Sequence, residues 1–207
     1  MDELLEVLLG GNTDANLQLA DPTLVNYYYD LKNRCVWIDH EIDNDTLSLV
    51  QQIVRWNRED KGRAQDERRP IIIFFNSVGG NLDVAEVICS IINLSQTPIY
   101  GIALGLVASA ASLIFLSCHK RYALPNAYFL VHRGSCSSVS GNFNEVQAMM
   151  ADYRAQVEKM EQFYIEHTLY SEEEVKARIN TDWYIRGDEI LEKGLITEWL
   201  TDLSIIL

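Results

Sequence analysis

The alternation of apolar and polar stretches along the chain predicts strands separated by helices. Residues 71–75 form a continuous apolar run rich in β-branched and aromatic side chains, and the run stops at the polar, glycine-containing stretch 76–80. Apolar residues then recur at helical spacing over residues 81–94, and a second apolar run follows Pro98. A buried strand, a helix and another buried strand predict a parallel βαβ unit.

The same pattern occurs again further along the chain. Gly105 is expected to break the second strand, residues 108–117 predict a helix of small residues, and residues 127–131 predict a strand that ends at His132. Repeated βαβ units predict an α/β fold whose functional loops follow the carboxyl ends of the strands. Residues 142–167 then predict a long helix with apolar side chains along one side, which is typical of an interaction surface.

The length and composition of the chain favour a single domain. Its 207 residues, 48% of them hydrophobic, can enclose one sizeable core. Residues 1–20, which end in a polar stretch, are expected to form an arm before a domain at 21–207. The 30 acidic and 17 basic residues give a net charge of −13, which opposes binding to nucleic acid or to anionic membranes.

One uncharged run could span a membrane by its length alone. Residues 99–118 carry no charge, but the preceding proline and the glycines and serines inside the run favour a buried strand, turn and helix. The leucine-rich stretch 4–9 has no basic region before it, so no secretory signal is expected. The cysteines form no C-x-x-C pair, which favours reduced thiols in the cytoplasm, and neither a metal nor a cofactor is expected.

Three residues could together support acyl transfer, which needs a nucleophile, a base and a group that orients the base. Ser109 lies where a strand is predicted to turn into a helix, His132 ends a strand at the same predicted sheet edge, and Asp182 precedes an aromatic pair. Each has a structural alternative: a helix N-cap for Ser109, a satisfied structural histidine for His132, and a turn or cap for Asp182. The residues alone leave both interpretations open.

The glycine turn after the first buried strand has two possible uses. Gly79 and Gly80 lack a Cβ, so their backbone N–H groups can be directed closely at a ligand. A phosphate-binding loop is the competing hypothesis. It is disfavoured because the chain has neither a G-x-G-x-x-G nor a G-K-[ST] motif.

Taken together, these motifs resemble the proteolytic subunit of the ATP-dependent Clp protease. Members of that family carry N-S-P-G-G, G-x-A-A-S, a histidine at a strand end and a late aspartate in that order. Residues 76–80 resemble the glycine turn, 105–109 the nucleophile turn, and 121–126 the stretch before the histidine strand. The likeness extends from about Tyr27 to Trp199.

The resemblance implies a role for each candidate residue. Ser109 would be the nucleophile, His132 the general base and Asp182 the carboxylate that orients the histidine. The N–H groups of Gly80 and Ala110 would form the oxyanion hole.

The resemblance also implies a fold, an assembly and partners. The fold is the ClpP/crotonase-like α/β fold of repeated βαβ units, with a projecting handle helix in the region 133–167. The implied function is a serine endopeptidase subunit in homo- or hetero-oligomeric heptameric rings, stacked as a tetradecamer. A AAA+ unfoldase of the Clp type would consume the ATP and deliver unfolded protein substrates.

Several positions depart from the family pattern. Val78 stands in place of a proline, Ala110 in place of a methionine, and Arg133-Gly134 in place of Gln-Pro. Thr181 stands where the family commonly has an arginine that takes part in contacts between rings. The three candidate catalytic residues are kept, whereas their neighbours differ.

Three alternative functions remain at this point. The chain could be a weakly active or structural ClpP-like subunit of a mixed ring. It could instead be a crotonase-type enzyme that binds an acyl-CoA through the glycine-turn N–H groups. A signal-peptide peptidase of the same broad fold is the third, although such enzymes typically pair a serine with a lysine.

Overall fold

The computed structural model describes residues 21–134 and 139–205 of the chain. Contacts within the chain divide it into two units, one that ends at Cys35 and one that begins at Val36. The arm expected at residues 1–20 lies outside the described residues.

The described part of the first unit is built around helix α2 (Pro22–Lys32). The helix begins at Asp21, whose carboxylate accepts the backbone N–H of Thr23, and Pro22 occupies the first turn, where its missing N–H costs nothing. It ends at Asn33, whose N–H donates to the carbonyl of Tyr29.

The second unit contains the other helices and the strands, except that β1 begins at Cys35, the last residue of the first unit. Its helical elements are η1 (Asn44–Leu47), α3 (Ser48–Glu59), η2 (Gln65–Glu67), α4 (Leu82–Leu94), α5 (Ala110–Leu116), α6 (Phe143–His167), α7 (Glu172–Arg178), α8 (Glu189–Glu192) and η3 (Leu203–Ile205). Its strands are β1 (Cys35–Ile38), β2 (Ile71–Ser77), β3 (Ile99–Ala108), β4 (Lys120–Ala123), β5 (Tyr128–Val131), β6 (Trp183–Ile185) and β7 (Glu198–Trp199).

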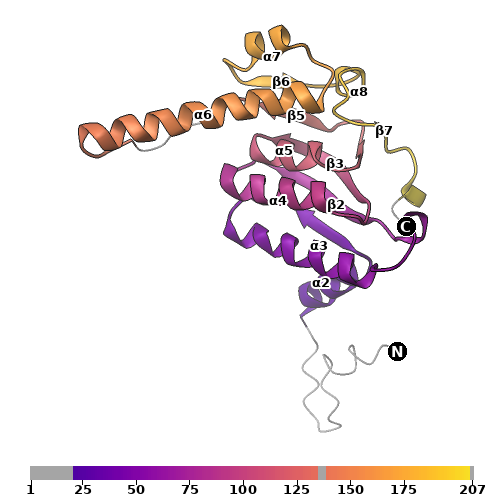
Figure 1. Cartoon of the computed structure of the whole chain (residues 1–207). Coiled ribbons are helices and arrows are strands. Elements are labelled where there is room, and N and C mark those ends of the chain that lie inside the picture. Colours follow the sequence, from indigo (N-terminus) through magenta and orange to yellow (C-terminus); the bar gives the residue numbers. More distant parts are fainter. Residues whose placement is uncertain (1–20, 135–138, 206–207) are drawn as a thin grey trace. The chain divides into compact units, whose positions relative to one another are not determined.

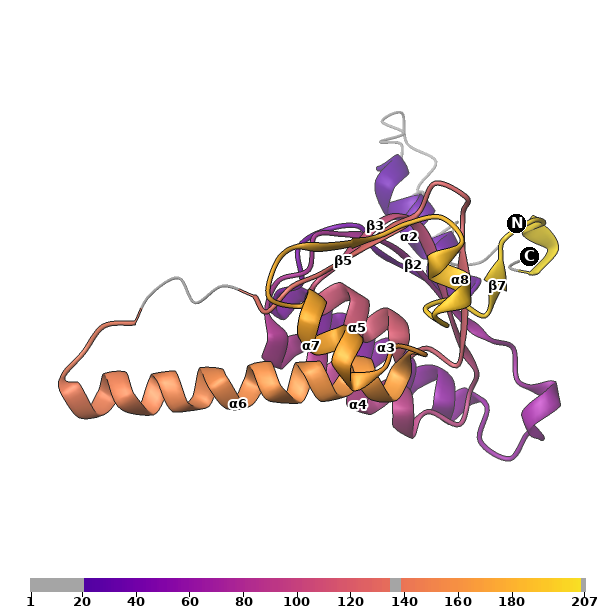
Figure 2. The same cartoon turned by 90° about the horizontal axis from the view of Figure 1, so that it is seen from above.

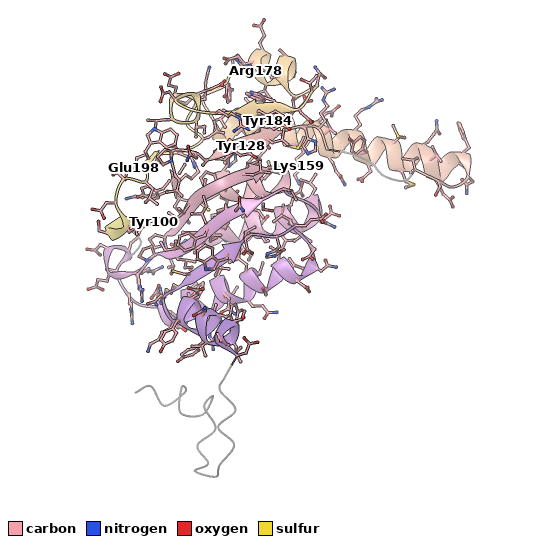
Figure 3. The ribbon with its side chains drawn as sticks, turned by 180° about the vertical axis from the view of Figure 1, so that it is seen from behind. Tyr100, Tyr128, Lys159, Arg178, Tyr184 and Glu198 are labelled. Carbon is pink, nitrogen blue, oxygen red and sulfur yellow. The ribbon has the colours of Figure 1, made fainter. Side chains whose placement is uncertain are left out.

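A mostly parallel sheet organises this unit. The strands run in the order β1-β2-β3-β4-β7, while β5 pairs with β3 and with β6. The pairs β2·β3, β3·β4 and β3·β5 are parallel, and β5·β6 is antiparallel, with Tyr128 and Tyr184 on these two neighbouring strands (Figure 3). The predicted α/β fold of repeated βαβ units is confirmed.

Helices α3, α4 and α5 lie on one face of the sheet, and α6 extends well beyond it (Figure 1, Figure 2). The predicted long helix therefore exists, and it projects from the unit as the handle hypothesis requires. It contacts α4 through a solvent-exposed ion pair, 2.5 Å long, between Lys159 and Glu86. Residues 135–138, within the predicted handle region, lie outside the described residues.

The expectation that Gly105 breaks the second strand is wrong, because β3 continues through it to Ala108. A Cβ on Gly105 would lie 2.7 Å from the side-chain oxygen of Asn76, which accepts the N–H of Leu106. The glycine therefore marks a close approach between β2 and β3, at the point where their register shifts. Beyond this point β3 exchanges its neighbour β4 for β5.

The uncharged run 99–118 forms β3, a turn and α5, as its proline, glycines and serines predict. Among the described residues, no helix has the length and apolar character needed to cross a membrane.

An aromatic cluster fixes α5 against the sheet. Phe115 of α5 lies with its ring centroid 5.2 Å from Phe75 of β2 and 5.2 Å from Phe129 of β5, and all three side chains are fully buried. Gly101 of β3 lets Phe115 approach, since a Cβ there would lie 3.0 Å from the ring. Burial of three large rings stabilises the packing of α5 against the sheet. Ser109 lies immediately before the first residue of α5.

Candidate active site

Ser109 adopts a backbone conformation that is rare for a residue with a side chain. It joins β3 to α5 with φ 49° and ψ −128°, a region that costs about 1–3 kcal/mol and persists only where the surroundings enforce it. Its N–H donates to Leu130 and its carbonyl accepts the Ser112 N–H, each at 2.9 Å. The Ser109 hydroxyl forms no capping bond to α5, so the N-cap alternative does not describe it.

Gly79 allows this turn to be tight. Its φ is +91°, and a Cβ there would lie 2.6 Å from the Ala108 carbonyl and 2.7 Å from the Ser109 Cβ. Only a glycine fits between the two backbones in this conformation. The signal was visible in the sequence as a glycine pair, but the residue it packs against was not.

Gly80 forms a parallel β-bridge with Ile42, which precedes η1, through the residues on either side of the glycine. The N–H of Ile42 donates to the Gly79 carbonyl and its carbonyl accepts the Asn81 N–H, both at 2.8 Å. Within the part of the chain that the structure describes, the N–H groups of Gly80 and Ala110 have no acceptor. Both residues line the same cavity as Ser109. Two unpaired N–H donors near a serine form the pattern that stabilises an oxyanion.

The three candidate catalytic residues each stand one residue beyond a strand end. Ser109 follows β3, His132 follows β5, and Asp182 precedes β6. Because β5 pairs parallel with the end of β3 and antiparallel with β6, these ends meet at one edge of the sheet. The structure thus brings together the three residues that the sequence singled out.

Among the described residues, no hydrogen bond joins the three side chains. Nδ1 of His132 lies 4.0 Å from Oδ1 of Asp182, which is beyond hydrogen-bond length. The Asp182 side chain is 63% exposed and that of His132 is 31% exposed. Among the described residues, the Ser109 hydroxyl has no hydrogen-bond partner, a looseness that is common in catalytic sites without substrate.

The other histidines have structural surroundings. Nδ1 of His119 accepts the Ile99 N–H, and burial lowers the pKa of its imidazole. The ring of His167 stacks on that of Phe163 with a centroid distance of 3.8 Å, and its Nδ1 donates to the Phe163 carbonyl. His40 contacts Asp39 and Thr46. His132 is the histidine that shares a cavity with Ser109.

A cavity of about 590 Å³ holds the site, and residues 153–160 of α6 form one of its walls. The cavity is lined by the two glycines, Ser109, Ala110 and His132, and on α6 by Tyr153, Gln156, Val157 and Met160. The sequence predicts α6 as an interaction surface and gives no sign that it also borders the cavity. Helical periodicity shows that one face is covered, not what covers it.

Arg133, the residue after His132, contacts α6. Its Nε and Nη2 lie 3.0 and 2.7 Å from one carboxylate oxygen of Glu161, which is nearly buried. The hydroxyl of Tyr153 also donates to the carbonyls of Arg133 and Gly134. The replacement of Gln-Pro by Arg133-Gly134 thus supplies a contact between the strand end and α6.

The family model described as "Clp protease" matches residues 21–202. The chain belongs to the Clp protease family. Proteolytic subunit 2 of the ATP-dependent Clp protease from Treponema denticola is 32% identical over 63% of this chain and 66% of its own length, just under two thirds. The Pseudomonas aeruginosa protein of the same name is 28% identical over 82% of each chain.

A solved structure supports the Clp protease fold independently. The structure is that of a mutant of ClpP1 from Listeria monocytogenes, and it superimposes with a TM-score of 0.74 over 88% of this chain and 99% of that one. The two sequences are 22% identical, so this likeness bears on the fold alone. The chain is accordingly a divergent member of the Clp protease family, and it has the fold of that solved structure.

We expect Gly79→Ala to inactivate the site. The new methyl group would meet the carbonyl of Ala108 and the Cβ of Ser109, so the turn must shift. A shift worth about 1.4 kcal/mol already lowers a rate about tenfold. The measurement is peptide hydrolysis and labelling of Ser109 by a fluorophosphonate. Gly62→Ala is the matched control, since Gly62 has a similar φ of +89° but nothing within 4 Å of its Cβ position. Equal activity of the two variants would contradict the packing role of Gly79.

Proposed function

We propose that the chain is a serine endopeptidase subunit in which Ser109 is the nucleophile, His132 the general base and Asp182 the group that orients the histidine. The observation that carries this proposal is the strained Ser109 turn, which shares one cavity with His132 and with two backbone N–H groups that have no acceptor among residues 21–134 and 139–205. Membership of the Clp protease family supports a peptidase.

The proposed reaction follows from the placement of these groups. Ser109 Oγ attacks the carbonyl carbon of the scissile peptide, and its proton passes to His132. Nδ1 of His132 faces Asp182, which leaves Nε2 to take that proton. The oxyanion of the tetrahedral intermediate accepts the N–H groups of Gly80 and Ala110. His132 then donates the proton to the leaving amine, and water hydrolyses the acyl-enzyme by the same steps.

The open contact between His132 and Asp182 favours one second candidate, a weakly active subunit of a mixed ring. At 4.0 Å the carboxylate does not yet fix the imidazole, and Asp182 is exposed to water. The intact Ser109 turn supports the active enzyme over this alternative, and the serine and histidine variants below separate the two.

Ser109→Ala should lower peptide hydrolysis by about 10⁴-fold or more, because it removes the attacking oxygen, and His132→Ala should cause a similar loss. Fluorophosphonate labelling should vanish with Ser109→Ala. Ser90→Ala, which alters an exposed serine on α4, serves as the control. Undiminished hydrolysis by pure Ser109→Ala protein would move the nucleophile elsewhere. A wild-type protein inert to both substrate and probe would support the structural-subunit alternative.

We further propose that the subunits form heptameric rings stacked as a tetradecamer, with the outer part of α6 between the rings. The support is a group of apolar side chains near the N-terminal end of α6 that are exposed to water in the single chain. Phe143 is 74% exposed, and Met149 and Met150 are 40% and 48% exposed. Side chains of this kind are stabilised when a second subunit removes them from water.

Phe143→Glu combined with Met149→Glu should separate the rings. Two buried carboxylates would oppose an apolar contact between subunits, so sedimentation should show particles of about half the native mass. Leu203→Glu, at an exposed leucine of η3, is the control and should leave the mass unchanged. An unchanged mass in the α6 variant would remove α6 from the interface between rings.

The proposed substrates are unfolded polypeptides delivered by a AAA+ unfoldase of the Clp type, in the cytoplasm. An enclosed ring admits peptides by diffusion and excludes folded proteins. The sequence contains no nucleotide-binding motif, so we propose that this chain uses no cofactor and that the partner consumes the ATP. The thiols of Cys89 and Cys118 are buried outside any disulfide, in keeping with a reducing compartment.

The isolated protein should cleave short peptides at most, and ATP alone should not change its rate. Addition of a Clp-type unfoldase with ATP should start degradation of a stably folded fluorescent protein, measured as loss of fluorescence. The controls are a non-hydrolysable ATP analogue and the Ser109→Ala ring. Rapid degradation of the folded protein by this chain without ATP would show that its sites are open to large substrates.

A further inference from the structure

The C-terminal part of α6 contacts the Ser109 turn through Tyr164, a side chain that does not line the cavity. The Tyr164 hydroxyl lies 2.6 Å from the Ser112 hydroxyl, and the Ser112 hydroxyl lies 2.6 Å from the Ser109 carbonyl. Tyr164 is 2% exposed and Ser112 is fully buried, so water does not compete for these bonds. The three groups form a continuous chain from α6 to the candidate nucleophile.

The direction of donation in this chain follows from counting hydrogens. Ser112 and Tyr164 each have one hydroxyl hydrogen. If Ser112 donated to Tyr164, the phenol hydrogen would be left without an acceptor among the described residues, inside a buried region. Donation from Tyr164 to Ser112, and from Ser112 to the Ser109 carbonyl, satisfies both hydrogens. Burial raises the pKa of the Tyr164 phenol well above its ordinary value, which keeps the donor protonated.

The Ser109 carbonyl is the point where such a bond affects chemistry. The positive φ of Ser109 is maintained from both sides, by the bond of its N–H to β5 and by the two donors of Ser112 to its carbonyl. A carbonyl that loses a donor can rotate, and rotation of this peptide unit also reorients the N–H of Ala110. Both the nucleophile and one proposed oxyanion donor would then leave their positions.

The same turn of α6 is also tied to the residue beside the proposed base. Glu161 stands one helical turn before Tyr164 and binds Arg133, which follows His132. Tyr164 and Glu161 therefore fix the α6 backbone to both halves of the site. Tyr164 itself does not line the cavity, so it can affect the reaction without touching the substrate.

We propose that Tyr164 is a positioning residue, which holds Ser109 in its reactive conformation through the hydroxyl of Ser112. This inference rests on the proposed role of Ser109 as nucleophile. It assigns to α6 a part in the chemistry that is separate from its part in assembly.

The test is Tyr164→Phe, which removes one hydroxyl and keeps the buried ring. We expect kcat per active site to fall about tenfold, with KM for a short peptide unchanged, as for a lost buried hydrogen bond that acts on the transition state alone. Ser112→Ala should cause a fall at least as large, because it removes the hydroxyl donor to the Ser109 carbonyl itself, whereas Tyr164→Phe leaves that donor without the bond that orients it. The double variant should be no slower than Ser112→Ala, because both changes break one chain. Active sites are counted by fluorophosphonate labelling carried to completion.

Two controls remove equivalent hydroxyls elsewhere. Tyr170→Phe deletes a buried phenol that donates to Glu189, and Ser117→Ala deletes a buried hydroxyl at the other end of α5. Both should keep the wild-type kcat per site.

Several outcomes would overturn the inference. An unchanged kcat per site in Tyr164→Phe would do so, as would a loss of activity explained wholly by fewer labelled sites, or additive effects of the two changes. If Ser109→Ala is inactive while Tyr164→Phe behaves as wild type, only the positioning role fails. If Ser109→Ala stays active, the nucleophile assignment fails, and the positioning role fails with it.

Discussion

The backbone of Gly79 packs so closely against Ala108 and Ser109 that no side chain could stand between them. This contact requires that β2 and β3 lie side by side in parallel and that both end at the same edge of the sheet. It also requires that the chain turn sharply after β3, which places Ser109 at a positive φ. The strain at Ser109 is tolerable because the aromatic cluster of Phe75, Phe115 and Phe129 fixes α5 and the sheet around it.

The irregularity between β2 and β3 has a similar consequence. β3 pairs with β4 over its first half and with β5 over its second half, and the change occurs where Asn76 packs against Gly105. A straight strand would keep one neighbour throughout. Because β3 changes partners, β5 and then β6 are brought to the edge where Ser109 lies, and with them come His132 and Asp182. The glycine and the asparagine thus determine which strand ends meet.

The sequence predicts the order of the elements well, because burial of strands and helices leaves a local periodic pattern. It predicts the βαβ units, the long helix and the meeting of Ser109 with His132 at one sheet edge. It wrongly predicts a break at Gly105, since a glycine that ends a strand and one that admits a neighbouring side chain have the same local pattern. It does not reveal the contacts of α6 with the site, such as Arg133 with Glu161, because these join residues far apart in the chain.

Helix α6 combines two tasks along one rigid element. Its outer part carries exposed apolar side chains, and its inner part carries Glu161 and Tyr164, which contact the two halves of the site. A helix of 25 residues rises about 1.5 Å per residue, so the ends lie far apart yet move together unless the helix bends. If a neighbouring subunit packs against the N-terminal part of α6, as we propose, this contact also limits the motion of Tyr164. Assembly would then favour the conformation in which Ser109 is held, without any new contact at the site itself.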